Sequence, residues 1–440
     1  MRPGRVKHRL TSEKSAYLRP LDMPVRSAIL AYRLVGIARA QREASTIAAM
    51  MNDDPIALVG GVRTAIGRFG GALKDVEAAD LGAACIRELV ARTGIAADSV
   101  DEVVMGQVGQ VGPDAYNARR CALGAGLPPS STAMNVNRLC SSGLQAIVSG
   151  AQSILSGQAE VVAAGGDESM SRQPFLEYGA RAGWRLGSRE SVDGTLSLLT
   201  DPFGKYHMGV TAEKVAERHG ISRAQQDAFA LQSQERAARA VAEGRFAEQI
   251  VAVDAPRASE PFSQDEHPRE TSLELLAGLK PVFQKDGSVT AGNSSGINDG
   301  AAAVLLMRLS QARERGLAPR LILRSWAVTG IEPEVMGYAP AMSIPKALEL
   351  AGKTVDDLDV IELNEAFAAQ AVAVAETLRL PSEKLNPCGG AIALGHPVGA
   401  TGAILTVKLM HELERTDAHW GLVSMCIGGG QGFAAVFERP

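Results

Sequence analysis

The chain has 440 residues, of which 46% are hydrophobic and 21% charged, a composition typical of globular proteins that excludes disordered and collagen-like chains. A net charge of −4 gives no sign of a nucleic-acid-binding surface, and no apolar run reaches the ~18 residues that a membrane-spanning helix needs. The 5 cysteines are too few, and odd in number, for a disulfide framework, so we expect reduced thiols.

The first fifty residues differ from the rest of the chain. They carry eight Arg and two Lys against three acidic residues, a net charge of +7. An Arg-rich, acid-poor segment is typical of a mitochondrial transit peptide. The alternative is an upstream start codon, with the natural protein beginning at Met50 or Met51. In either case we expect residues 1–52 to be a basic leader outside the fold.

Strands and helices alternate through the next part of the chain. Strand-like apolar runs occupy 56–59, 103–105, 133–137 and 161–164, and segments with helical spacing occupy 79–92, 115–124 and 141–155. This alternation predicts an α/β fold with a mostly parallel sheet. The end of the chain repeats it, with helices expected at 345–351, 365–378 and 400–413 and strands at 360–363 and 422–425. The repetition suggests a duplicated unit.

Residues 170–297 separate the two halves. They contain a long helical segment at 223–244 and a polar, Pro-containing stretch at 254–269. Because helices and apolar clusters persist here, we interpret the segment as an inserted loop domain rather than a linker. We therefore expect residues 53–169 with 298–316 to form one α/β domain and residues 317–440 to form a second. Loops on a rigid scaffold commonly carry binding surfaces.

Cys140 stands at a predicted strand-to-helix junction. The helix dipole and the free N–H groups at a helix N-terminus favour a thiolate, and the same N–H groups can stabilise an oxyanion. Cys140 is therefore a candidate nucleophile, although a small core residue is the alternative. Cys85 and Cys121 lie on predicted helices and are interpreted as buried structural thiols, and Cys388 as a small packing residue.

His396 lies within the glycine-rich segment Gly389–Gly402. A lone His is usually a structural group, but one fixed in a Gly-Pro turn before a helix is suited to act as base for a nearby thiol. The segment lacks the Gly-Lys-Ser/Thr ending of a phosphate loop. Cys426 follows a C-terminal strand and could transfer a proton to or from carbon, or it could be a buried Cys. Cysteine and histidine can bind zinc, but no CxxC pair or usual ligand spacing is present, so we expect no metal site.

Together these segments resemble the signature set of the thiolase family. The matching segments, in order, are Asn135–Ala146, Gly292–Gly300, Asn364–Phe367, Gly389–Gly402 and Cys426–Gly432. The resemblance covers about residues 53–440. It implies a duplicated five-layered α/β/α/β/α fold whose inserted loop domain binds CoA and takes part in oligomer contacts.

The resemblance also implies roles for single residues. Cys140 would take the acyl group, His396 would activate it, and Cys426 would move the proton at the α-carbon of the second acyl-CoA. Asn364 would hold a water that forms one oxyanion hole with His396, and the backbone N–H groups of Cys140 and Gly428 would form the other. These roles imply an acetyl-CoA C-acyltransferase that uses ping-pong chemistry on CoA thioesters and needs no cofactor.

Within the family, Tyr206–Gly209 resembles the short-chain, biosynthetic or broad β-ketothiolase type. By the same resemblance, the residues lining the CoA and acyl pocket are Leu199, His207, Met208, Arg269, Phe283, Ala291, Ser295 and Phe367. The resemblance implies acyl-CoA and CoA as partners, a homodimer or homotetramer, and neither nucleic acid nor membrane. We expect a cytoplasmic enzyme, or one of the mitochondrial matrix if the leader is a transit peptide.

Two alternatives remain at this point. Condensing enzymes that act on carrier-protein substrates usually have His or Asn where this chain has Cys426, so this position favours thiolase. A non-catalytic, thiolase-like subunit that binds acyl-CoA is the other alternative, and the presence of all three reactive residues counts against it. The sequence does not determine the acyl chain length or the direction of the reaction.

Overall fold

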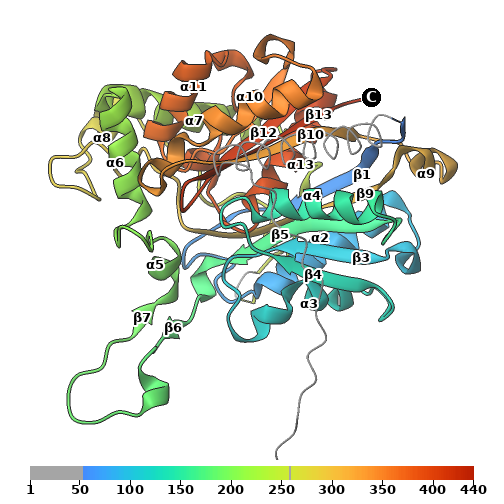
Figure 1. Ribbon diagram of the computed structural model, residues 1–440, viewed down its shortest axis with the longest axis horizontal. Coiled ribbons are helices and arrows are strands. Elements are labelled where there is room, and N and C mark those ends of the chain that lie inside the picture. The colour runs from blue at the N-terminus through green and yellow to red at the C-terminus, as the bar shows by residue number, and fades with distance from the viewer. Residues whose placement is uncertain (1–52, 257–258) are drawn as a thin grey trace, which may run out of the picture. The chain divides into compact units, whose positions relative to one another are not determined.

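The main sheet consists of two halves, and corresponding strands follow the same order in both halves (Figure 1). The computed structural model describes residues 53–256 and 259–440, so the predicted leader lies outside the described residues. In the first half, β1 (Ile56–Thr64) is followed across the sheet by β9 (Asn298–Arg308), β5 (Val162–Ser169), β3 (Glu102–Gly106) and β4 (Thr132–Val136). In the second half, β10 (Leu321–Gly330) is followed by β13 (Gln431–Glu438), β12 (Trp420–Ile427) and β11 (Val360–Leu363).

The pairing directions also agree between the halves. Each begins with two antiparallel pairs, β1–β9–β5 and β10–β13–β12, and continues with a parallel pair, β5–β3 and β12–β11. The halves join where β1 and β10 pair antiparallel over only Ile56–Leu58 and Leu321–Leu323. The predicted duplication of an α/β unit is thus confirmed, although the pairing within each half is mixed rather than mostly parallel.

The helices complete a five-layered arrangement, as predicted. The first outer layer, α2 (Ala78–Thr93) and α3 (Asn117–Gly124), packs on the first half-sheet. The central layer is α4 (Ser142–Leu155) with α13 (Thr401–Arg415), which contacts strands of both halves. The second outer layer, α10 (Pro340–Ala351) and α11 (Ala368–Leu378), covers the apolar face of the second half-sheet.

The segment between β5 and β9 packs mainly on the second half. Its helices are α5 (Gly194–Leu198), α6 (Met208–His219), α7 (Arg223–Ala242) and α8 (Leu273–Ala277). Helices α6 and α7 pack against α11, and the strand β8 (Ile250–Val251) pairs with the end of β1. The hairpin of β6 (Phe175–Leu176) and β7 (Val192–Asp193) extends away from the layers (Figure 1). The remaining short strand and α-helices are β2 (Gly67–Arg68), α9 (Leu309–Glu314) and α12 (Ala391–Leu394).

Two predicted helix boundaries were wrong. The helix expected from residue 345 begins at Pro340, because Pro340 suits the first helical turn while Pro345 is accommodated inside α10. The helix expected from residue 365 begins at Ala368, because Phe367 keeps an extended backbone and Glu365 turns its carboxylate toward Ser233 and Asn386. None of the described helices is both long and apolar enough to cross a bilayer.

Candidate active site

Two glycines let the central helices α4 and α13 cross in close contact. A Cβ on Gly143 would lie 2.8 Å from the backbone nitrogen of Ala403, and a Cβ on Gly402 would lie 2.4 Å from that of Leu144. Any larger residue would therefore push the helices apart. Because Cys140 lies two residues before α4 and His396 lies five residues before α13, the crossing brings the predicted nucleophile and base to one region.

Cys140 occupies a strained turn between β4 and α4. The preceding residue, Leu139, has a φ of +48°, in the left-handed region that side chains other than Gly rarely adopt. Cys140 is half-buried as a residue, and its sulfur accepts hydrogen bonds from the backbone N–H groups of Gly428 and of Cys140 itself. Burial raises the pKa of the thiol, these two N–H groups lower it, and the Glu168 carboxylate raises it. The resting thiol is thus protonated, so a base is needed to activate it.

His396 is held at three points. Its backbone N–H donates to Oδ1 of Asn298 at 2.9 Å, its Nδ1 lies 2.6 Å from Oγ1 of Thr401, and its Nε2 lies 3.4 Å from Nδ2 of Asn364. The Thr401 hydroxyl donates its single proton to the carbonyl of Pro397, so Nδ1 of His396 must carry the ring proton. Burial lowers the pKa of His396 to about 4. The ring is therefore neutral near pH 7, and its Nε2 lone pair accepts the amide N–H of Asn364.

Asn364 and Cys426 lie buried behind these groups. Asn364 follows β11, and its side-chain oxygen accepts no hydrogen bond from the described part of the chain. A buried amide oxygen of this kind is suited to hold a water molecule. Cys426 is the penultimate residue of β12 and is fully buried, and both burial and the neighbouring Cys140 raise its pKa. The chain then turns sharply at Gly429 and Gly430, whose φ angles are +81° and +85°.

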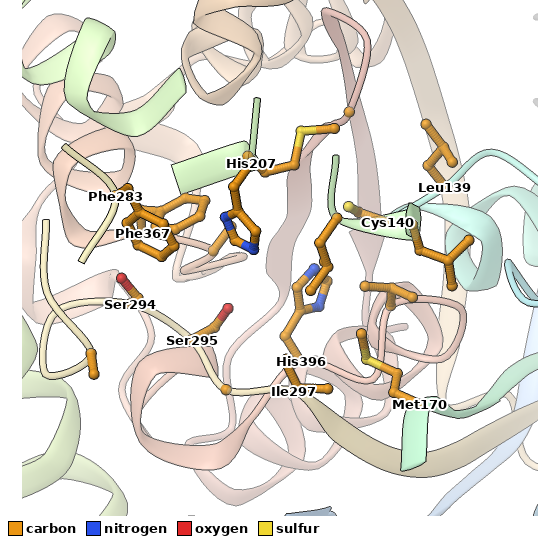
Figure 2. Close-up of a pocket in the computed structure, with 18 of the residues that line it drawn as sticks. Leu139, Cys140, Met170, His207, Phe283, Ser294, Ser295, Ile297, Phe367 and His396 are labelled. Carbon is orange, nitrogen blue, oxygen red and sulfur yellow. The ribbon is translucent and has the colours of Figure 1, made fainter. Parts of the chain in front are cut away.

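Most of the predicted site residues line one cavity of about 370 Å³ (Figure 2). Its walls include Cys140, His396 and Gly428. They also include all eight residues predicted for the CoA and acyl pocket: Leu199, His207, Met208, Arg269, Phe283, Ala291, Ser295 and Phe367. Asn364 and Cys426 are fully buried and are not among the residues that line it.

The side of the cavity opposite Cys140 is built on aromatic contacts. The His207 ring stacks on Phe283 at 4.7 Å between centroids, and Phe283 meets Phe367 edge-on at 6.0 Å. The Nδ1 of His207 accepts the N–H of Gly209, and burial lowers the pKa of the ring, so the neutral ring carries its proton on Nε2 as a donor. The guanidinium of Arg269 donates to the carbonyl of Ala291 at 2.9 Å.

Sequence reasoning missed several residues of the site. The cavity wall also contains Val108, Leu139, Met170, His267, Ile297, Met336 and Val398. Ile297 and Val398 lie inside quoted glycine-rich segments, and Leu139 adjoins Cys140, so closer attention to the neighbours of each motif could have found them. His267 had no such signal. Within residues 53–256 and 259–440, no group of three or more His, Cys, Asp and Glu side chains is placed to bind a metal ion.

A thiol under two backbone N–H groups, beside a neutral imidazole and an apolar cavity, is the arrangement of an enzyme that transfers acyl groups through a thiol. The family model described as "Thiolase, N-terminal domain" matches residues 56–310, and "Thiolase, C-terminal domain" matches residues 317–439. The chain belongs to the thiolase family and is an acyltransferase.

Individual relatives agree with this assignment. The chain is 52% identical to the β-ketothiolase BktB of Cupriavidus necator over 87% of its own length and 99% of the relative. It is 50% identical to an acetyl-CoA acetyltransferase of Chromobacterium violaceum over 88% of its length and 100% of the relative.

Solved structures also match the chain. An acetyl-CoA acetyltransferase of Bacillus anthracis gives a TM-score of 0.86 at 44% identity, covering 88% of this chain and 99% of that one. Human mitochondrial 3-ketoacyl-CoA thiolase in complex with CoA gives a TM-score of 0.85 at 40% identity, covering 88% and 98%.

Proposed function

We propose that the enzyme condenses an acyl-CoA with acetyl-CoA and, in reverse, cleaves 3-ketoacyl-CoA with CoA, through an acyl group carried on Cys140. The observation that carries the proposal is the hydrogen bonding of the Cys140 sulfur to the N–H groups of Cys140 and Gly428, in the cavity that His396 also lines. The names of the relatives, β-ketothiolase and acetyl-CoA acetyltransferase, support the same reaction.

In the first half-reaction, Nε2 of His396 takes the proton of the Cys140 thiol. The thiolate attacks the thioester carbonyl, and the electron pair of the C=O bond moves to oxygen. The N–H groups of Cys140 and Gly428 stabilise this oxyanion, for which a single donor is worth about 3–4 kcal/mol. The intermediate collapses, CoA leaves as a thiolate, and it takes the proton from His396. The product thioester is close in energy to the starting one, which suits a reversible reaction.

In the second half-reaction, Nε2 of His396 takes the proton of the Cys426 thiol, and the Cys426 thiolate removes an α-proton from acetyl-CoA. A water held by Asn364 and the N–H now present at Nε2 of His396 stabilise the resulting enolate oxygen. The enolate carbon attacks the carbonyl of acyl-Cys140, and Cys140 leaves as a thiolate that takes the proton back from His396, so one carbon–carbon bond forms and one carbon–sulfur bond breaks. The buried position of Cys426 beside Cys140 and the unpartnered oxygen of Asn364 support these roles.

The preferred acyl group is short. A cavity of about 370 Å³ lies at the small end of the range for ligand sites, and it must also hold part of the CoA arm. Thiolysis rates measured on a series of 3-ketoacyl-CoAs should fall beyond medium chain length. A maximum at long chains would contradict this preference.

The chemistry needs no metal ion or further cofactor, because a thiol, an imidazole and N–H donors supply the nucleophile, the base and the charge stabilisation. Activity should therefore survive extensive dialysis against EDTA. A loss that added metal restores would contradict this.

The functional unit is a homodimer or homotetramer in the cytoplasm. The edge strand β4 leaves Met134 exposed, and the β6–β7 hairpin exposes Phe175, Tyr178 and Leu186, as surfaces that pair with another copy do. Light scattering should give a mass of two or four chains, and a monomer would contradict the proposal. Cell fractionation tests the location.

A steady-state assay with acetoacetyl-CoA and CoA tests the proposed reaction. Rapid formation of acetyl-CoA is expected. Turnover only with carrier-protein thioesters would favour a condensing enzyme, and binding without turnover would favour a non-catalytic subunit.

A further inference from the structure

A buried carboxylate, Glu168, lies behind the wall of the catalytic cavity and has no part in the reaction steps above. It stands near the end of β5 and is 0% exposed. Its Oε2 accepts the N–H groups of Val108 and Gly399, both at 2.9 Å, and its Oε1 accepts that of Gly109 at 3.1 Å. The amide of Gln173 lies 3.5 Å from Oε1. A buried carboxylate that accepts hydrogen bonds from three backbone N–H groups strongly holds together the segments that carry those groups.

The joined segments are the two sides of the catalytic site. Val108 packs with Val398 and Met170 in an apolar cluster that also contacts Cys140. Gly399 lies three residues after His396, in the turn that leads to α13. A Cβ on Gly399 would lie 2.5 Å from Oε2 of Glu168, so the contact requires glycine at this position. The carboxylate therefore links the wall beside the nucleophile to the loop of its base.

We propose that Glu168 is a positioning residue that fixes His396 relative to Cys140 by joining the Val108–Gly109 turn to the Pro397–Gly399 turn. The inference rests on the roles proposed above for Cys140 and His396. Glu168 itself contacts no reacting atom. Burial raises its pKa to about 7, and its three backbone donors oppose that rise. Asp114 and Asp167 are the other carboxyl groups that interact with it electrostatically.

The neighbouring residue offers a matched control. Asp167 is also 0% exposed and lies one position earlier on the same strand, so its side chain points to the opposite face of the sheet. There it accepts the amide of Asn117 and lies 3.2 Å from the sulfur of Cys121. Among the described residues, no hydrogen bond joins its side chain to the segments of Cys140 or His396, and burial raises its pKa to about 8.

The test compares Glu168→Gln with Asp167→Asn at pH 8 in the full chain. Two quantities are measured: the rate at which acetyl-CoA acetylates Cys140, by mass spectrometry, and the pH midpoint of Cys140 alkylation by iodoacetamide. In Glu168→Gln the acetylation rate should fall about 10–100-fold, because small displacements of a catalytic group cost that much. Its alkylation midpoint should move down by roughly half a unit or more, because a negative neighbour is removed. Asp167→Asn should change neither quantity by more than about twofold.

Glu168→Asp gives a second, independent readout, and it is also the informative variant if Glu168→Gln does not fold. It keeps the charge but shortens the side chain by one methylene. Its acetylation rate should fall while its alkylation midpoint does not move down. Acetylation of folded Glu168→Gln or Glu168→Asp at the wild-type rate would overturn the positioning role, and an unmoved midpoint in Glu168→Gln would overturn the effect of the Glu168 charge on the Cys140 thiol. Failure of the wild-type enzyme to acetylate Cys140 would instead overturn the proposed function itself.

Discussion

The hydroxyl of Thr401 fixes the protonation state of the proposed base, and removing it should slow acetylation of Cys140. Thr401→Val has nearly the same shape but leaves Nδ1 of His396 without its acceptor at 2.6 Å. A buried donor without a partner costs about 1–3 kcal/mol. The ring can avoid that cost only by moving its proton to Nε2, the nitrogen that must receive the thiol proton. Since 1.36 kcal/mol is a tenfold change in rate, we expect acetylation to slow about 5–150-fold.

The assay is the single-turnover rate of Cys140 acetylation by acetyl-CoA, followed by intact-mass spectrometry. Thr401→Ser is the matched control, because it keeps the hydroxyl and should stay within about threefold of the wild type. Equal thermal midpoints for the two variants would exclude a folding defect. If Thr401→Val acetylates at the wild-type rate, the assignment of the His396 tautomer and of Thr401 as its acceptor is wrong.

Three further predictions follow. In Cys426→Ala, Cys140 should still be acetylated, but the rate of condensation should fall about 10²–10⁴-fold because the group that accepts the α-proton is gone. An equal fall in the rates of both steps would mean that Cys426 acts on Cys140. Gly402→Ala should lower the free energy of unfolding by about 1–3 kcal/mol through overpacking against Leu144, measured by urea denaturation. Gly278→Ala, whose Cβ would have ordinary contacts, is its control, and equal stability of the two variants would contradict the close crossing. The acid limb of the pH profile for Cys140 acetylation should have its midpoint nearer pH 4 than pH 6.5. His396 has a pKa of about 4, so it is protonated and loses its function as a base only below that pH. A midpoint near pH 6.5 would contradict a buried, neutral base.

The chemistry-bearing residues could be predicted because each lies in a distinctive local segment. Cys140 at a strand-to-helix junction and His396 in a glycine-rich turn are visible without knowledge of the fold, and the alternation of strands and helices predicts the two halves. The resemblance then supplied the eight pocket residues, all of which line the cavity.

The groups that hold those residues in place could not be predicted in the same way. Glu168 and Gly399 are 231 positions apart, and their contact joins a carboxylate to a backbone N–H, which leaves no pattern in either segment. His267 lies in a polar stretch of the insertion and reaches the cavity only through the tertiary fold. The short β1–β10 pairing that joins the halves also has no local signature.

The central claim is that Cys140 carries the acyl group, and one measurement tests it directly. The protein is incubated with acetyl-CoA, quenched in acid and digested, and its peptides are identified by mass spectrometry. The account predicts one acetyl group on the peptide that contains Cys140, and none on the corresponding peptide of Cys140→Ser. An acetyl group on Cys85, Cys121, Cys388 or Cys426 instead, or an unacetylated enzyme that still cleaves acetoacetyl-CoA, would contradict it.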